Sequence, residues 1–359
     1  MSMARNLIIA CAAMAGLAIP VNAQELKKIA EISVPGEPMA WFDISYLDQK
    51  TQRYYFSDRS NKAIDIIDAK TNQFLGRFAV FIGVRTANGK VDNSISGPNG
   101  LAMVGNEIWA GDGDSTVKVI DLKTMKVVDT ISTGGKKRAD NVEYDAKDKI
   151  VIIDNADDEP PFMTMVSAKP GHKALGKLSF PDATDGLEHP MYNPVDGLVY
   201  QAIPELRHDD KKGGVAVIDP RTIRLLKTFE VDNCKQAGMA QGPNNNLVLG
   251  CNTHGDNQTI VVMNWKSGKV VANVPDIGGA DQVNYNRKNN QYYIAARAMK
   301  GGPVLGVIDA ASNRLVQKIA TTGGTPHSVA SNEADGHVFL PVGSSDGGCS
   351  CVQVFAPAP

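Results

Sequence analysis

The sequence has little that would mark a membrane or nucleic-acid protein. Apart from a short stretch near its start, no run of residues is apolar enough to cross a bilayer. Its formal net charge is only −2, from 37 Lys and Arg against 39 Asp and Glu. This balance lacks the basic excess that attracts nucleic acid or an anionic membrane. We therefore expect neither nucleic-acid binding nor membrane insertion.

Several catalytic motifs are also missing. The chain contains no phosphate-binding loop, no Cys-x-x-Cys-His haem attachment site and no His-Glu-x-x-His zinc-protease pattern. Aromatic residues make up only 6% of the chain, whereas it has 34 glycines and 19 prolines. Such a composition is typical of many short strands joined by tight turns.

The first 23 residues have the pattern of a secretory signal peptide. Arg5 precedes an apolar stretch from Leu7 to Ile19, and Val21-Asn22-Ala23 is a small-residue cleavage signal. The sequence predicts cleavage after Ala23, which would release residues 24–359 as a periplasmic or secreted domain.

Four cysteines follow the predicted cleavage site: Cys234, Cys251, Cys349 and Cys351. An oxidising compartment and an even count favour disulfides, and Cys234 and Cys251 fall on facing strands of one expected hairpin. The Cys349-Ser350-Cys351 pair is close for a bridge. We favour bridging or loop bracing there over metal binding, since no further ligands stand nearby.

A repeat of roughly 45 residues runs through the whole chain. Its clearest part is an apolar strand that ends in Asp, then a turn, a basic residue and another strand. Examples are Val-Ile-Asp at 119–121 and 217–219, with Ile-Ile-Asp at 66–68. Asp recurs there because its side chain accepts a hydrogen bond from the backbone two residues on. The units span residues 38–79, 97–132, 137–182, 185–231, 235–274, 278–319 and 323–356.

Seven such units predict an all-β, seven-bladed β-propeller with four antiparallel strands in each blade. The last unit lacks a complete final hairpin, whereas residues 29–34 read as a strand without a blade. We expect this N-terminal strand to pair into the seventh blade and close the ring as one domain, which removes exposed sheet edges.

These units resemble the YVTN-type propeller repeat family. That family pairs a Val-Ile-Asp hairpin with a Gly-Gly-x-Pro-His entry to the next blade, and Gly323-Gly324-Thr325-Pro326-His327 matches the entry closely. The resemblance covers nearly all of the mature chain and implies the fold. It does not imply one function, since such propellers serve as lactonases, redox-enzyme subunits and binding proteins.

Superposing the units places one polar residue of most blades at the same height of the central channel. We call this set the polar ring; it consists of Asp43, Asn99, Asp140, Glu188, Asp281 and His327. Ala237 fills the equivalent position of blade five, where the loop around His254 is able to lean over the gap. The residues two further along are mainly apolar, as buried strands require.

Four carboxylates at one channel mouth cannot all stay ionised without compensation. Either some hold protons with raised, coupled pKa values, or a cation sits among them. The oxygens suit Ca²⁺, while His327 shifts the preference towards Zn²⁺. The predicted metal ligands are Asp43, Asn99, Glu188, Asp281 and His327. The set is similar in type to the metal site of gluconolactonase-like (senescence-marker-protein) propellers. Glu188, Asn99 and Asp281 are the positions of this chain with the residue types of that site, but the family's order and spacing are not reproduced, so the resemblance implies only the type of site.

Two function classes follow. In the first, the protein is a metal-dependent, lactonase-like hydrolase that acts on a small molecule. Asp140 or Asp281 would take the proton of the bound water, and His254 is a further candidate base. In the second, a non-catalytic propeller binds a small molecule, an ion or a protein partner, and the polar ring is a hydrated channel lining.

The sequence also predicts what surrounds the ring. Long connections at 81–96, 154–162 and 202–214 are expected on the same face, as candidate lids. His189 follows Glu188, so strand alternation predicts that it faces a blade interface.

Overall fold

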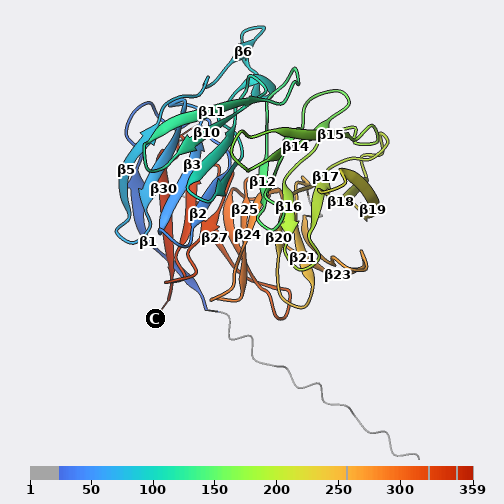
Figure 1. Cartoon of the computed structure of the whole chain (residues 1–359). Coiled ribbons are helices and arrows are strands. Elements are labelled where there is room, and N and C mark those ends of the chain that lie inside the picture. The colour runs from blue at the N-terminus through green and yellow to red at the C-terminus, as the bar shows by residue number, and fades with distance from the viewer. Residues whose placement is uncertain (1–23, 256–257, 322–323, 345–346, 359) are drawn as a thin grey trace, which may run out of the picture.

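The computed structural model describes residues 24–255, 258–321, 324–344 and 347–358. The predicted signal peptide, residues 1–23, lies outside the described residues. Strands dominate, and seven four-stranded antiparallel sheets are arranged around a central channel (Figure 1). The predicted seven-bladed propeller is confirmed.

Blades one to three follow one another along the chain, and each begins with its innermost strand. Blade one contains β2 (Ser45–Asp48), β3 (Arg53–Asp58), β4 (Ala63–Asp68) and β5 (Gln73–Phe78). Blade two contains β8 (Leu101–Val104), β9 (Glu107–Gly111), β10 (Thr116–Asp121) and β11 (Lys126–Ser132). Blade three contains β12 (Val142–Asp145), β13 (Ile150–Asn155), β14 (Phe162–Ser167) and β15 (Ala174–Ser179).

Blades four to six repeat this order. Blade four contains β16 (Pro190–Asn193), β17 (Leu198–Ile203), β18 (Lys212–Asp219) and β19 (Arg224–Asp232). Blade five contains β20 (Gln236–Gln241), β21 (Asn246–Cys251), β22 (Thr259–Asn264) and β23 (Val270–Pro275). Blade six contains β24 (Ala280–Asn286), β25 (Gln291–Ala296), β26 (Val304–Asp309) and β27 (Arg314–Ala320).

Blade seven is assembled from both ends of the chain. It contains β28 (Ala330–Ser331), β29 (Val338–Val342) and β30 (Cys351–Pro357), with β1 (Leu26–Ser33) as its outer strand. Strand β1 pairs antiparallel with β30, and Leu26 lies opposite Pro357 (Figure 1). The N-terminal strand therefore closes the ring as expected, although it begins three residues earlier than the sequence pattern indicated.

The repeated Asp turns form for a local reason. The Oδ1 atom of Asp68 accepts hydrogen bonds from the backbone N–H groups of Lys70 and Thr71, at 2.9 and 3.1 Å. Asp121 does the same with Lys123 and Thr124. Each aspartate thus holds the turn between the two outer strands of its blade.

The hydrophobic core lies between neighbouring blades. One cluster joins blade four to blade five and includes Tyr200, Val217, Met239, Leu249 and Trp265. Because every inner strand is packed on both faces in this way, the channel wall is a rigid frame for polar side chains.

Irregular segments are few. The connection between blades one and two carries a small hairpin of β6 (Thr86–Ala87) and β7 (Lys90–Val91), followed by the 3₁₀ helix η1 (Asn93–Ile95). Within the described ranges, no helix has the length and apolar character of a membrane span.

Candidate functional site

Backbone hydrogen bonds place the polar ring at one level of the channel. In blades one to four the ring residue lies two positions before the innermost strand and donates its N–H to a carbonyl at the end of the second strand. The pairs are Asp43 to Ser57, Asn99 to Gly111, Asp140 to Asp154 and Glu188 to Ala202. Because the same contact recurs in four blades, these side chains start from equivalent positions around the axis.

Five members of the polar ring line one cavity of about 160 Å³, which we call the mouth cavity. They are Asp43, Asp140, Glu188, Asp281 and His327. Asn99 is fully buried beside them, and Ala237 is buried in blade five. His254 is exposed and does not line the mouth cavity. The structure thus brings the ring together but leaves the third candidate catalytic residue outside it.

Three arginines that the sequence pattern did not single out complete the site. Arg59 forms an ion pair with Asp43, and their side chains are only 3% and 6% exposed. The same guanidinium donates to Oδ1 of Asn99, with N···O distances of 2.6 and 3.1 Å. One guanidinium group therefore contacts both an acid and an amide of the predicted metal ligands.

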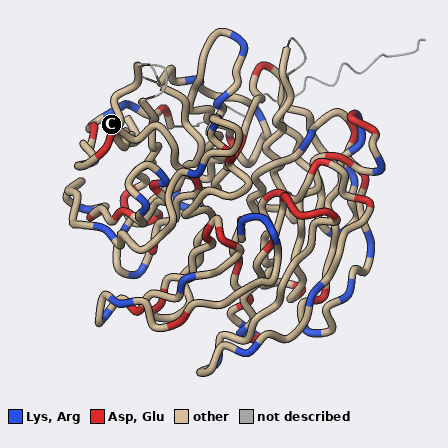
Figure 2. The backbone as a smooth tube through the Cα atoms, turned by 90° about the horizontal axis from the view of Figure 1, so that it is seen from above, with Lys and Arg blue, Asp and Glu red and all other residues tan. Residues whose placement is uncertain are grey.

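The other two arginines pair with acids further round the ring. A guanidinium nitrogen of Arg138 lies 2.7 Å from a carboxylate oxygen of Asp140, and its Nε lies 2.9 Å from one of Asp157. Arg297 lies 2.6 Å from Asp281. Acidic and basic positions are likewise interspersed over the whole molecule when it is seen from above (Figure 2).

His327 links three charged groups. Its Nε2 lies 3.2 Å from Asp43 and 3.1 Å from Asp281, while its Nδ1 lies 3.4 Å from a guanidinium nitrogen of Arg297. A guanidinium only donates hydrogen bonds, so Nδ1 accepts and the ring proton sits on Nε2. The imidazole therefore connects Arg297 to the two carboxylates.

Glu188 is the carboxyl group of the polar ring that takes no part in these ion pairs. Among the described residues, its side chain makes no hydrogen bond or ion pair, although its backbone is held by Ala202 and Gln201. Burial raises the pKa of Glu188 well above its usual value, and the nearby charges of Asp281 and Asp140 raise it further. The protonation of Glu188 therefore depends on the charge of any group that enters the mouth cavity.

The paired acids titrate differently from one another. Burial alone would raise the pKa of Asp43, but Arg59 and His327 together hold it below its ordinary value. For Asp140, burial outweighs the attraction of Arg138 and raises the pKa to about 7. The ring therefore holds ionised and protonatable carboxyls side by side.

The donor atoms of the predicted metal site are largely engaged. Asp43 and Asn99 contact Arg59, and Asp281 contacts Arg297 and His327. In the part of the chain that the structure describes, only Glu31, Cys349 and Cys351 bring three potential ligand atoms within 4.8 Å of one another. A divalent ion in the polar ring would have to displace arginines, so this donor set does not fit a metal well.

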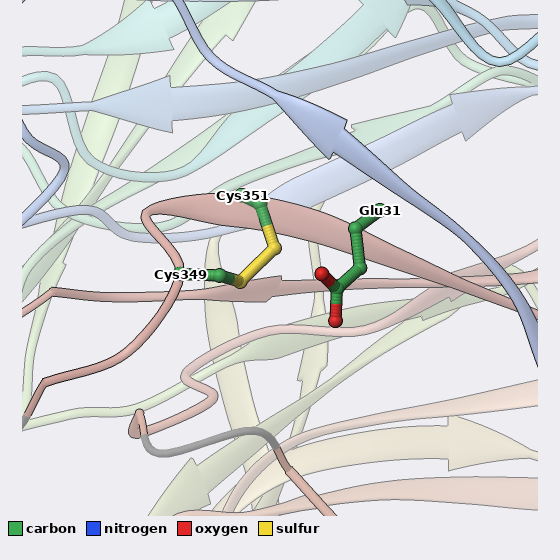
Figure 3. A group of neighbouring side chains, drawn as sticks. All are labelled: Glu31, Cys349 and Cys351. Carbon is green, nitrogen blue, oxygen red and sulfur yellow. A yellow bond between two sulfur atoms is a disulfide. The ribbon is translucent and has the colours of Figure 1, made fainter.

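That second group is not a thiolate site. Cys349 and Cys351 form a disulfide, with the carboxyl group of Glu31 beside it (Figure 3). Because both sulfurs are bonded to each other, neither is available as a metal-binding thiolate. A second disulfide joins Cys234 to Cys251, with a Cα–Cα distance of 4.5 Å. For Cys349 and Cys351 the sequence favoured a bridge or loop bracing over metal binding, and the structure contains the bridge.

Loops extend the site outward between blades three and four. A cavity of about 240 Å³ shares Arg138 and Glu188 with the mouth cavity and also contacts Lys235 and Asn252. A third, of about 430 Å³, continues from it to His208. The three long connections supply Asn93, residues 156–161, and Pro204 with His208 to these cavities. They therefore lie on the face of the ring, as the sequence predicted.

His189 does not face a blade interface. It lines the channel below the polar ring, in a different cavity from its neighbour Glu188. The strand β16 begins only at Pro190, so the alternation of a regular strand does not yet apply at residue 189.

Comparison with known proteins supports the fold and little else. No family model matches the chain. Over 188 residues it is 28% identical to the uncharacterized protein YncE of Salmonella typhi and to that of Salmonella typhimurium. The match covers 50% of this chain and 48% of each relative, so it spans about half the length of the curated relatives.

A solved structure matches over more of the chain. A chain of Kuenenia stuttgartiensis hydrazine synthase superposes with a TM-score of 0.72 and 14% identity, covering 90% of this chain and 97% of that one. At this identity the likeness concerns the fold alone. The chain is a seven-bladed β-propeller, with YncE as a distant relative over about half of its length.

Proposed function

We propose that this propeller binds a small, positively charged organic molecule at the mouth cavity, with Glu188 as the group that receives the positive charge. The observation that carries the proposal is the unpaired carboxyl of Glu188 in a cavity where the other acids have partners.

Charge balance supports a cationic ligand. Three guanidinium groups stand among five carboxyls, which are Asp43, Asp140, Asp157, Glu188 and Asp281. Burial without full compensation is what raises the pKa of Glu188 and of Asp140. An ammonium group beside Glu188 would supply the missing charge and favour the ionised carboxylate.

Size supports a small ligand. A volume of about 160 Å³ holds a few water molecules, at roughly 30 Å³ each, or a ligand of a few heavy atoms. The connected cavities beyond Arg138 give a longer ligand room to extend between blades three and four.

The test is calorimetric titration with propylammonium, and with propan-1-ol and propionate as neutral and anionic ligands of the same length. We expect propylammonium alone to bind, and Glu188→Gln to weaken binding at least about tenfold, or about 1.4 kcal/mol. Glu107→Gln, at the start of β9 and away from the ring, is the matched control. Preference for propionate, or equal binding by Glu188→Gln, would refute the proposal.

Binding should also depend on pH. The raised pKa of Glu188 means that this carboxyl must lose a proton before it can pair with an ammonium group. We therefore expect the affinity for propylammonium to rise with pH, and protons to be released on binding below the pKa of Glu188.

A second candidate function is the hydrolysis of a lactone or ester. One observation favours it: the protonatable Glu188 lies within reach of the charges of Arg138 and Arg297. The arginines would stabilise a developing oxyanion, and the carboxyl would donate a proton. Elemental analysis of the purified protein, together with a lactone screen, tests both this candidate and the predicted Ca²⁺ or Zn²⁺. About one ion per chain would favour the metal-dependent mechanism of hydrolysis, in which Asp140 or Asp281 is the base.

Export remains part of the proposal. Two disulfides are what an oxidising compartment favours, and they support the predicted periplasmic or secreted location. If neither ligand nor substrate is found, a protein partner on the loop face becomes the candidate.

A further inference from the structure

A second cavity occupies the channel below the polar ring. This channel cavity has a volume of about 320 Å³, and all seven blades contribute to its lining. It shares only Ile44 with the mouth cavity. A volume of this size is in the range of small-molecule sites, which begin at roughly 300 Å³.

The end of the channel cavity next to the ring is apolar. Five residues form this apolar belt. Ile44 directly follows Asp43 of the polar ring, and the other four lie two positions after a ring residue or, in blade five, after Ala237. They are Leu101, Val142, Met239 and Val283, all at most 5% exposed. An apolar belt of this kind favours the burial of a hydrocarbon or aromatic body.

Two polar atoms of residues that line this cavity, Ser45 Oγ and His189 Nδ1, have no hydrogen-bond partner among the described residues. The Nδ1 atom of His189 is shielded from solvent. Burial lowers the pKa of His189 to about 4, so the ring is neutral at pH 7. A neutral imidazole in an apolar setting gains from a hydrogen bond to a ligand, because water does not satisfy it there.

The lining also limits the charge of an occupant. No lysine or arginine occurs among the described residues that line the channel cavity, so an anion has no counter-charge there. A cation would lose its hydration against the apolar belt. Burial also raises the pKa of Glu143, a carboxyl group in the lining, to about 7, which disfavours its charged form. The polar ring lies at one end of the channel cavity. Tyr46 and Glu333 line the cavity towards the opposite end, from which a ligand would enter.

We propose that the channel holds a second binding site, for a small uncharged molecule with an apolar body and one hydrogen-bonding group that pairs with the imidazole of His189. This site does not depend on the cation site at the mouth, because the two cavities share only Ile44 in their linings.

The experiment uses p-cresol and toluene, which differ by one hydroxyl group. Titration is followed by NMR of the mature protein and of His189→Leu, which removes the ring nitrogen and keeps an apolar side chain. We expect saturable binding of p-cresol that weakens about tenfold in His189→Leu, whereas toluene binding changes little.

Two further variants keep the result interpretable. Met239→Trp narrows the apolar belt and should abolish binding of both probes, and Glu107→Gln, outside both cavities, should change neither. Absence of saturable p-cresol binding to the wild-type protein would overturn the proposal and leave a channel that holds water. Equal p-cresol affinity in His189→Leu would overturn the assignment of the partner residue.

Discussion

The Nε2 atom of His327 lies between the carboxylates of Asp43 and Asp281, 3.2 Å from the first and 3.1 Å from the second. One imidazole from blade seven thereby joins blades one and six. These are its two neighbours in the ring, so the histidine connects the closing blade to both sides of the propeller at the channel mouth.

Removal of this link should weaken the closure. We expect His327→Ala to lower the free energy of unfolding by about 1–2 kcal/mol, because two carboxylates lose a hydrogen-bond donor while keeping their arginines. Urea denaturation measures the change. His208→Ala, in an exposed loop, is the control and should have almost no effect. Equal stability of the two variants would show that the link carries no net energy.

The buried pair of Arg59 and Asp43 should matter more. Arg59→Met leaves a buried carboxylate without its main counter-charge, so we expect a loss of about 3–5 kcal/mol in unfolding free energy. Arg53→Met breaks a pair with Asp68 in which the arginine is 35% exposed, and should cost less than about 1 kcal/mol. Similar losses in both variants would contradict the importance of burial.

Stability should fall as pH rises from 5 to 8, in part because of Glu143. Burial raises the pKa of this channel-lining carboxyl to about 7, whereas in the unfolded chain it is about 4.3. A raised folded pKa means that the stabilising contribution is complete below the unfolded value and is lost as pH rises through about 7.

Glu143→Gln keeps the shape of the side chain without its titration. We expect this variant to show a smaller loss of unfolding free energy between pH 5 and 8 than the wild type, by on the order of 3 kcal/mol. Urea titrations at four pH values measure the difference. Parallel pH profiles would mean that Glu143 is already ionised in the fold.

The two disulfides should differ in their effect on stability. Cys234 and Cys251 are 17 residues apart, so their bond restricts a sizeable loop of the unfolded chain and should contribute about 3 kcal/mol. Cys349 and Cys351 are 2 residues apart and restrict almost nothing. Double alanine variants of each pair, compared by thermal unfolding, test this. A larger loss for the second pair would point to a role in the folded state instead.

Local and periodic signals explain what the sequence could predict. The turn at Asp121 depends on backbone groups two and three residues away, so its pattern is visible in any short window. The ring position of Glu188 follows from counting within repeats, because blades fold alike. Its lack of a partner does not follow, since that depends on which side chains the neighbouring blades send into the channel.

The arginines illustrate the limit. Arg59 contacts Asn99 at a separation of 40 residues, from one blade to the next, and no local pattern carries that contact. A weaker signal was present, however. Arg59 and Arg297 each stand directly after the second strand of their blade, β3 and β25, so counting forward from those strands would have placed both at the ring.

The pairing of β1 with β30 also sets an order of events during synthesis. Residues 26–33 are synthesised well before their partners at 351–357. Leu26 and Ile32, buried in the finished ring, must stay uncovered while some 320 residues are made, which gives this strand the longest wait of any in the chain. A factor that shields an apolar strand in the meantime would act on these eight residues. The last step of folding would be the pairing of residues 351–357 with this strand, which was made much earlier.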